Sequence, residues 1–184
     1  LDDQDAFSTM DRWADAVPVG SNGVMFNPSL AGGTRQDKSV NIQGAFVGLH
    51  LGTTRSDLIR AGLEGIALNL RLSLDSLREQ VPVNNRLLFC GGGSKSPLWR
   101  QIFANVLGIP LQMVKTEQGP GYGGAMLAMV CSGAYPTVQA AADALVEVAA
   151  TVEPDPTLTA KYEERYRQFR KIYPACKDLF SQLQ

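Results

Sequence analysis

The middle of the chain carries one long pattern of apolar residues at helical spacing. Between residues 59 and 77 an apolar residue recurs every three or four positions, which predicts an amphipathic helix of about five turns. The stripe consists of Ile59, Leu63, Ile66, Leu70, Leu74 and Leu77. Thr54 and Asp57 have the spacing of a capping box at its start. We expect this stripe to be buried.

The arginines of this segment fall mostly off the stripe, and we expect them on the solvent-exposed face of the helix. They are Arg55, Arg60, Arg71 and Arg78. Glu64 lies between two stripe residues, and we expect it to have a structural or boundary role.

Further along the chain, a short apolar run leads into a glycine cluster. Residues 87–89 (Leu-Leu-Phe) predict a buried strand. The cluster that follows is Gly91, Gly92 and Gly93. Ser96 and Pro97 suit the N-cap and the first position of a helix, which Gly108 would end.

The same order is then repeated. Residues 111–114 predict a second strand, residues 117–124 a second glycine turn, and residues 125–131 a small-residue helix. Two strand–turn–helix units in succession predict neighbouring parallel strands in an α/β fold. Both glycine turns would then lie at the same edge of the sheet, where ligands of such sheets bind.

The ends of the chain give weaker patterns. Residues 2–16 predict a helix, 24–26 a strand, 29–44 a surface loop and 137–148 an Ala-rich helix. An aromatic face marks one closing helix, and we expect it to pack in the core because no basic groove accompanies it. Its members are Tyr162, Tyr166, Phe169 and Tyr173.

The first glycine cluster is the main candidate for a binding site. A helix that starts directly after it would direct unpaired N–H groups and a positive dipole end at a phosphate or nucleotide. A tight turn without a ligand explains the same residues. The second cluster fits GxGxxG, with Asp143 downstream, but Asp143 falls in a predicted helix and Pro120 lacks an N–H group. It therefore does not indicate a dinucleotide site.

Composition limits the function classes. The chain has 184 residues, of which 45% are hydrophobic, and a net charge of −1 from 17 Lys and Arg against 18 Asp and Glu. We expect no nucleic-acid surface, and no membrane association because no apolar run is long enough to span a bilayer. The three cysteines fit neither a disulfide framework nor a zinc site, which favours the cytoplasm. The first residue is Leu1, so we expect the chain to start inside a longer polypeptide.

Catalytic chemistry is harder to find. His50 is the only histidine and has no triad partner at a suitable spacing, so we expect a structural role for it. Glu117 is expected to face the cleft, but no substrate proton is identified for it. The residues alone predict a nucleotide-binding unit without a catalytic group or a metal-ligand cluster.

An ordered set of motifs resembles the FGGY carbohydrate kinases. Residues 44–49 (GAFVGL) and 57–65 (DLIRAGLEG) are similar to the second signature region of that family. Residues 91–101 (GGGSKSPLWRQ) resemble its adenosine-binding loop and helix, and residues 104–111 and 117–128 continue the match. The resemblance extends from about residue 17 to the end of the chain.

The resemblance implies an actin/hexokinase-like (ribonuclease H-like) ATPase fold, of which residues 1–184 would be most of the C-terminal, nucleotide-binding domain. Such enzymes phosphorylate a sugar with ATP and Mg²⁺. Gly91, Gly92, Gly93 and Ser96 would contact the adenosine and α-phosphate side of ATP or ADP. The resemblance places the sugar site, the catalytic base and the first phosphate-binding loops in upstream segments and no metal ligand in this chain. We therefore expect the isolated chain to be inactive as a kinase and to bind nucleotide weakly at best.

Within the family, the residues look most like xylulose kinases, which convert D-xylulose to D-xylulose 5-phosphate. Gluconate, ribulose and glycerol kinases are the alternatives, as is a kinase-derived binding module without chemistry. Residues 31–35 (AGGTR) and 41–44 (NIQG) depart from the usual Gly-Glu-Arg and Ala-Arg-Gly, which leaves the sugar open. A homodimer is also left open.

Overall fold

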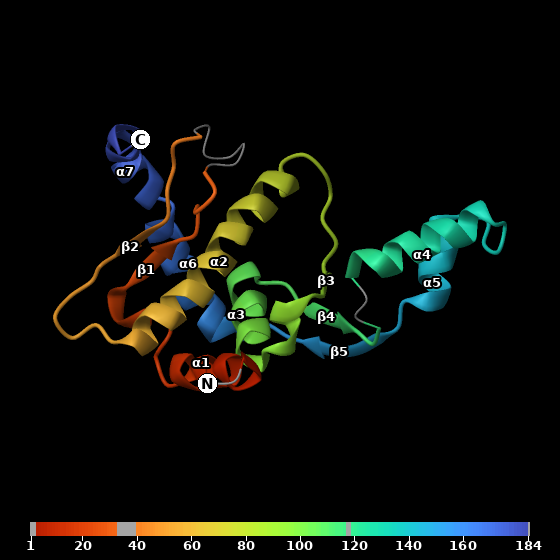
Figure 1. The fold of residues 1–184 in the computed structure, drawn as a ribbon, viewed down its shortest axis with the longest axis horizontal. Coiled ribbons are helices and arrows are strands. Elements are labelled where there is room, and N and C mark those ends of the chain that lie inside the picture. Colours follow the sequence, from red (N-terminus) through yellow and green to blue (C-terminus); the bar gives the residue numbers. More distant parts are fainter. Residues whose placement is uncertain (1–2, 33–39, 117–118, 184) are drawn as a thin grey trace.

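One long helix, α2 (Arg55–Arg78), forms the centre of the fold (Figure 1). In this computed structural model residues 3–32, 40–116 and 119–183 are described. Thr54 Oγ1 accepts a hydrogen bond from the Asp57 N–H at 3.3 Å, and Asp57 Oδ2 accepts one from the Thr54 N–H at 2.7 Å. The predicted capping box is therefore confirmed.

Helices and a strand pack around α2. Helix α1 (Asp3–Asp15), helix α3 (Pro97–Leu107) and strand β1 (Met25–Asn27) contact it directly. A short 3-10 turn, η1 (Ser21–Gly23), precedes β1, which pairs antiparallel with β2 (Ala45–Val47). The predicted strand at 24–26 is shifted by one residue. Gly65 allows β1 to cross α2, because a Cβ there would collide with the Phe26 carbonyl oxygen.

A three-stranded sheet in the order β3-β4-β5 lies beside α3. Strands β3 (Leu87–Phe89) and β4 (Leu111–Val114) are parallel and are joined by α3, as predicted. Strand β5 (Val148–Val152) is antiparallel to β4. The helix predicted for residues 137–148 is therefore too long, and β5 is not predicted from the sequence. Helix α5 (Val138–Leu145) instead ends three residues earlier, and Val148 and Val152 then favour strand as β-branched residues.

The main hydrophobic core lies between α2, α3, β4 and α6 (Pro156–Phe169). Tyr162, Tyr166 and Phe169 are buried in it, which confirms the predicted packing role of the aromatic face. The closing helix is wrong as predicted, since Tyr173 belongs to a separate helix, α7 (Ile172–Gln182). Pro174 explains the break, because in a continuous helix its ring would clash with the carbonyl of Arg170.

The predicted buried stripe of α2 is wrong over much of its length. Ile66, Leu70 and Leu77 are 38%, 45% and 47% exposed. The face that packs inward carries small residues and polar groups instead, which let α1, α3 and β1 approach closely. Its buried members are Asp57, Arg60, Ala61, Glu64, Gly65, Ala67, Leu68 and Leu74. Apolar periodicity predicts burial of the more apolar face of α2, but the described residues do not cover that face fully.

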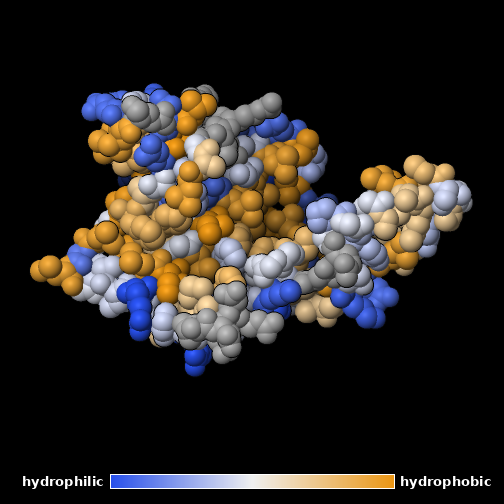
Figure 2. All heavy atoms as spheres, viewed as in Figure 1, coloured by the Kyte–Doolittle hydropathy of each residue, from blue (hydrophilic) through white to orange (hydrophobic). Residues whose placement is uncertain are grey.

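Apolar surface is also exposed on the sheet. Leu88 of β3 is 57% exposed, so the strand is correctly predicted but not buried as expected. Strand β3 lies at the edge of the described sheet. Figure 2 shows apolar residues gathered over the centre of the same view, around α2 and toward the sheet.

Helices α4 (Gly119–Cys131) and α5 pack on each other and extend away beyond the sheet (Figure 1). None of the α4 residues is buried. The prediction of a glycine turn over residues 117–124 is therefore wrong from Gly119 onward, because residues 119–124 form the first turns of α4. The Tyr122 hydroxyl, which donates a hydrogen bond to the Leu145 carbonyl at 2.6 Å, ties this part of α4 to α5. No described helix is long and apolar enough to cross a membrane.

Candidate functional site

The first glycine cluster lies at the carboxyl end of β3. We call Gly91, Gly92 and Gly93 the glycine loop. Gly91 has φ 90°, and a 3-10 turn, η2 (Gly92–Lys95), then leads to Ser96 and α3. Ser96 Oγ accepts a hydrogen bond from the Trp99 N–H at 3.0 Å, and Pro97 occupies the first turn. Gly108 ends α3 in the left-handed conformation. The predicted N-cap and both ends of this helix are confirmed.

Ser94 holds the glycine loop from inside. Its N–H and its hydroxyl both donate hydrogen bonds to the Gly91 carbonyl, at 3.1 Å and 2.7 Å, and the residue is 1% exposed. The Ser96 N–H donates to the Gly93 carbonyl at 3.3 Å. The loop is thus a defined turn whose shape is set by its own backbone and by Ser94.

The three glycines have different surroundings. Around Gly91 and Gly92, no atom of the described residues other than their chain neighbours lies within 4 Å of the position where a Cβ would be. At Gly93 a Cβ would lie 2.8 Å from Cζ3 and 2.9 Å from Cε3 of the Trp99 ring. The loop therefore has one open side, at Gly91 and Gly92, and one side filled by Trp99.

The second glycine segment does not form a matching turn. It leaves the same edge of the sheet, because β3 and β4 are parallel, but from Gly119 it is helical. Glu117 and Gln118 lie outside the described residues, as do Thr34 and Arg35, so the expectation that Glu117 faces the cleft is not examined by the structure. Asp143 lies exposed on α5 and accepts a hydrogen bond from Gln139 Nε2 at 2.7 Å.

No metal centre can be built from the described residues, among which no group of three or more His, Cys, Asp or Glu lies close enough to hold an ion. His50 is exposed, and its Nδ1 accepts a hydrogen bond from the Gly52 N–H at 3.1 Å, which agrees with the structural role expected for it.

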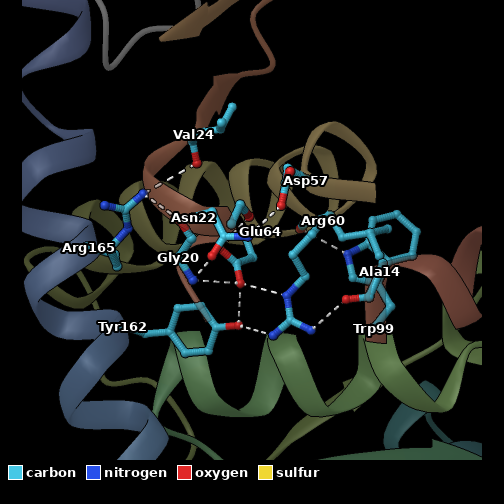
Figure 3. Close-up of polar contacts among 12 residues, drawn as sticks. Ala14, Gly20, Asn22, Val24, Asp57, Arg60, Glu64, Trp99, Tyr162 and Arg165 are labelled. Atoms are coloured by element: carbon cyan, nitrogen blue, oxygen red, sulfur yellow. Dashed lines mark hydrogen bonds and ion pairs between the residues drawn. The ribbon is translucent and has the colours of Figure 1, made fainter. Parts of the chain in front are cut away.

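Arg60 and Glu64 form a buried ion pair at the centre of the fold (Figure 3). Glu64 directly follows Leu63, whose carbonyl accepts a hydrogen bond from Trp99 Nε1. Arg60 Nε lies 2.7 Å from Glu64 Oε1, and these side chains are 7% and 4% exposed. Arg60 Nη2 donates to the Tyr162 hydroxyl at 3.0 Å, and that hydroxyl donates to Glu64 Oε1 at 2.9 Å. Arg60 Nη1 also donates to the Ala14 carbonyl at 3.4 Å.

The prediction of a solvent-exposed Arg60 is therefore wrong. Arg71 also departs from it, since its side chain is 16% exposed and donates to the Val106 carbonyl at 2.7 Å and to Asp75 at 3.0 Å. A signal was present in the sequence, because Arg60 and Glu64 are four residues apart on one helix. That spacing is typical of exposed pairs as well, so it could not reveal the burial.

Glu64 also holds a strained turn. Its carboxylate accepts hydrogen bonds from the Gly20 N–H at 3.1 Å and from the Ser21 hydroxyl at 3.2 Å. Ser21 and Asn22 both have φ 51°, a left-handed conformation that costs about 1 to 3 kcal/mol per residue. Asn22 Nδ2 donates to Asp57 Oδ1 at 2.8 Å, so α2 stabilises this turn through two carboxylates.

Protonation states follow from this geometry. Burial raises the pKa of the Tyr162 hydroxyl above its ordinary value, and the Glu64 carboxylate raises it further, so the hydroxyl keeps its proton. Burial alone would lower the pKa of Arg60, but Tyr162 and Glu64 raise it above its ordinary value. The Thr54 backbone and hydroxyl lower the pKa of Asp57. These groups are fixed in one state and are suited to holding the fold rather than to moving protons.

Known proteins are similar to this chain in sequence and in fold. Residues 1–132 match the FGGY family of carbohydrate kinases, C-terminal domain. Over 181 residues the chain is 30% identical to a xylulose kinase of Staphylococcus epidermidis. That alignment covers 98% of this chain and 36% of the relative, so the chain spans little more than a third of the relative's length.

Two solved structures show the same arrangement. The xylulose kinase from Rhodospirillum rubrum superimposes with a TM-score of 0.83 at 29% identity, covering 98% of this chain and 36% of that chain. The ligand-bound xylulose kinase from Lactobacillus acidophilus gives a TM-score of 0.87 over 96% of this chain and 36% of that chain. Its identity of 24% supports a likeness of fold alone.

The buried pair generates a stability prediction. Glu64→Ala leaves the Arg60 charge buried without its partner and removes the acceptor of Gly20 and Ser21, so we expect a loss of about 3 to 5 kcal/mol in the free energy of unfolding. Glu163→Ala is the matched control, because Glu163 is 40% exposed and Arg71, its partner, keeps its contacts with Asp75 and the Val106 carbonyl when Glu163 is removed. We expect it to cost less than about 1 kcal/mol. Urea unfolding measures both, and equal losses would contradict the central role of Glu64.

Proposed function

This chain belongs to the FGGY family of carbohydrate kinases, and we propose that it is most of the C-terminal, nucleotide-binding domain of an ATP-dependent sugar kinase. A preceding N-terminal domain of the same polypeptide would bind the sugar. Because the relative at 30% identity is a xylulose kinase, D-xylulose is the proposed substrate and D-xylulose 5-phosphate the product. The cytoplasm is the proposed location, as all three cysteines are free.

The open side of the glycine loop carries this proposal. At Gly91 and Gly92 the backbone can be approached closely, because no side chain of the described residues occupies the space above them. The N-terminus of α3 follows, with Ser96 as its cap, and its dipole favours a negatively charged ligand. The proposed roles of Gly91, Gly92, Gly93 and Ser96 are therefore to hold the adenosine and α-phosphate side of ATP.

The chain's own residues would bind and orient the nucleotide and leave the transfer step to other groups. Bound ATP supplies the phosphoryl group, and transfer depends on positioning and on charge stabilisation around its terminal phosphate. The tyrosine, arginine and carboxylates of the buried network are already paired with one another. The proposed places of the Mg²⁺ ion and of the base that activates the sugar hydroxyl are accordingly in the preceding part of the protein.

The exposed face of α2 supports a domain that extends beyond the described residues. Ile66, Leu70 and Leu77 form an apolar stripe on this face, and Leu88 exposes a further apolar side chain on the edge strand β3. The alignment covers 36% of the xylulose kinase relative, so most of that relative's length lies outside the match. The proposed occupant of the α2 stripe is a preceding segment of the same polypeptide.

An activity assay tests the proposed reaction. We expect the full-length protein to release ADP from MgATP with D-xylulose at a higher kcat/KM than with ribulose, gluconate or glycerol. The measurement is a coupled ADP-release assay across this panel. Turnover that favours another member would replace the proposed substrate, and a protein that binds ADP without turning over any sugar would be a binding module.

A substitution in the glycine loop tests the proposed nucleotide site. Gly92→Leu places a side chain in the open space, so the protein should fold normally while ADP affinity falls by at least about tenfold, or 1.4 kcal/mol. Calorimetric titration of the full-length protein with ADP measures this. Ala175→Leu adds a similar side chain at an exposed position of α7 and should leave binding unchanged. Unchanged binding in a folded Gly92→Leu variant would refute the assignment.

The apolar stripe of α2, which we propose is covered by the preceding segment, gives a further prediction. In the full-length protein Leu70→Asp should place a charge under the preceding segment and lower the thermal midpoint by several degrees, since burying an unpaired charge costs more than about 1 kcal/mol. Leu51→Asp is the control, because Leu51 lies fully exposed in a turn and should tolerate the charge. Differential scanning calorimetry compares the two, and equal midpoints would show that the stripe is exposed to solvent.

A further inference from the structure

Trp99 packs against the glycine loop at Gly93, and its ring does not reach the Cβ positions of Gly91 and Gly92. It is in the first turn of α3, and its ring occupies the place that a side chain at residue 93 would need. Approaches of 2.8 and 2.9 Å between a Cβ and ring carbons are shorter than packed atoms tolerate. Any residue other than glycine at position 93 would therefore displace either the ring or the loop.

The ring itself has little freedom to move. Its Nε1 donates a hydrogen bond to the Leu63 carbonyl of α2 at 3.1 Å (Figure 3). The ring also packs on Phe103 with 5.4 Å between ring centroids, and Phe103 packs in turn on Phe89 of β3 at 4.9 Å. The Trp99 backbone N–H is held by Ser96 Oγ. Both the central helix and the strand that leads into the loop thus fix the position of the ring.

We propose that Trp99 is a positioning residue for the nucleotide loop, whose ring substitutes for a side chain at Gly93 and keeps Gly91 and Gly92 in the open geometry. This inference rests on the proposed function, because it names a residue that acts through the loop and does not touch the nucleotide. The requirement for glycine then has a different cause at position 92 and at position 93. Residue 92 must lack a side chain because of the ligand. Residue 93, whose backbone keeps its proposed place in the site, must lack a side chain because of Trp99.

Tryptophan supplies two contacts at this position. Its flat ring fills the space beside a residue without a Cβ, and its indole N–H donates a hydrogen bond to the Leu63 carbonyl. Phenylalanine would keep part of the ring and lose the donor. Leucine would lose both and leave room for a methyl group at residue 93.

A double-mutant cycle in the full-length protein tests this coupling. We expect Gly93→Ala alone to raise the KM for ATP and the Kd for ADP by about tenfold, with kcat within about twofold of the wild type. Trp99→Leu alone should raise them by a similar factor. The double variant should be no weaker than Trp99→Leu alone, because the added methyl group then meets no ring. Losses that multiply would show that positions 93 and 99 act on the nucleotide independently of each other, and would overturn the proposal.

Further variants separate positioning from loss of stability. Trp99→Phe should give an intermediate KM for ATP and an unchanged KM for the sugar. If the leucine variant does not fold, Trp99→Phe replaces it in the cycle, where part of the ring remains and the loss in the double variant should still be smaller than the product of the two single losses. Phe180→Leu removes a buried aromatic ring from α7, a helix that lies away from α3 and β3 (Figure 1). It should lower the thermal midpoint without changing the KM for ATP. An equal rise in this KM for Phe180→Leu would contradict the proposal.

The two levels of inference fail in different ways. If the wild-type full-length protein binds no ADP in calorimetry, the proposed function fails whatever Trp99 does. If the wild type binds ADP and Gly92→Leu abolishes binding, but Gly93→Ala and Trp99→Leu bind as tightly as the wild type, the nucleotide site stands and the role of Trp99 is refuted.

Discussion

The described structure depends on the burial of one carboxylate. Glu64 connects α2 to the turn at Gly20 and Ser21 and, through Tyr162, to α6. Taking an ion pair out of water is costly, and it is sustained only when the remaining donors and acceptors are satisfied. Here Arg60, Tyr162 and the backbone of the turn all find partners. An apolar pair could fill the same volume but could not hold the left-handed turn, because that turn needs an acceptor for its N–H group.

The network also bears on the candidate site, because α2 serves both. The carbonyl that anchors Trp99 belongs to Leu63, the residue directly before Glu64. One turn of α2 therefore points a carboxylate toward the strained turn and a carbonyl toward the ring beneath the glycine loop. The orientation of α2 is set by its buried polar face, and the loop takes its position from the same helix. We therefore expect both the stability of the fold and the position of the glycine loop to depend on α2. Substitutions at Glu64 and at Trp99 should still affect them separately.

The sequence predicted what local chemistry decides. The caps at Thr54 and Ser96, the end of α3 at Gly108 and the parallel pair β3 and β4 are confirmed because each depends on neighbouring residues or on one short connection. The motif order identified the FGGY family, which the match over residues 1–132 confirms, and with it the actin/hexokinase-like fold shared with the solved xylulose kinases. The assignment of Gly91, Gly92, Gly93 and Ser96 to the nucleotide stays a prediction.

The predictions from sequence are wrong mainly where segments distant in the sequence determine whether a residue is buried. Arg60 was expected in solvent because no local rule shows that Tyr162 and the Ala14 carbonyl will enclose it. Ile66 and Leu70 were expected in the core because apolar periodicity does not say which partner covers a face. The start of α4 was missed because glycines weaken a helix without forbidding it.

The glycine loop shows most clearly why a motif does not assign roles. Three identical residues stand in a row, and their spacing alone suggests one shared purpose. Among the described residues, a Cβ at Gly91 or Gly92 would meet no atom within 4 Å beyond its chain neighbours, whereas at Gly93 it would meet an indole ring that is held by another helix. A single ligand-based explanation would therefore misread one of the three. The requirement for glycine can come from the ligand on one side of a loop and from packing on the other, and only the atoms around each Cβ position distinguish them.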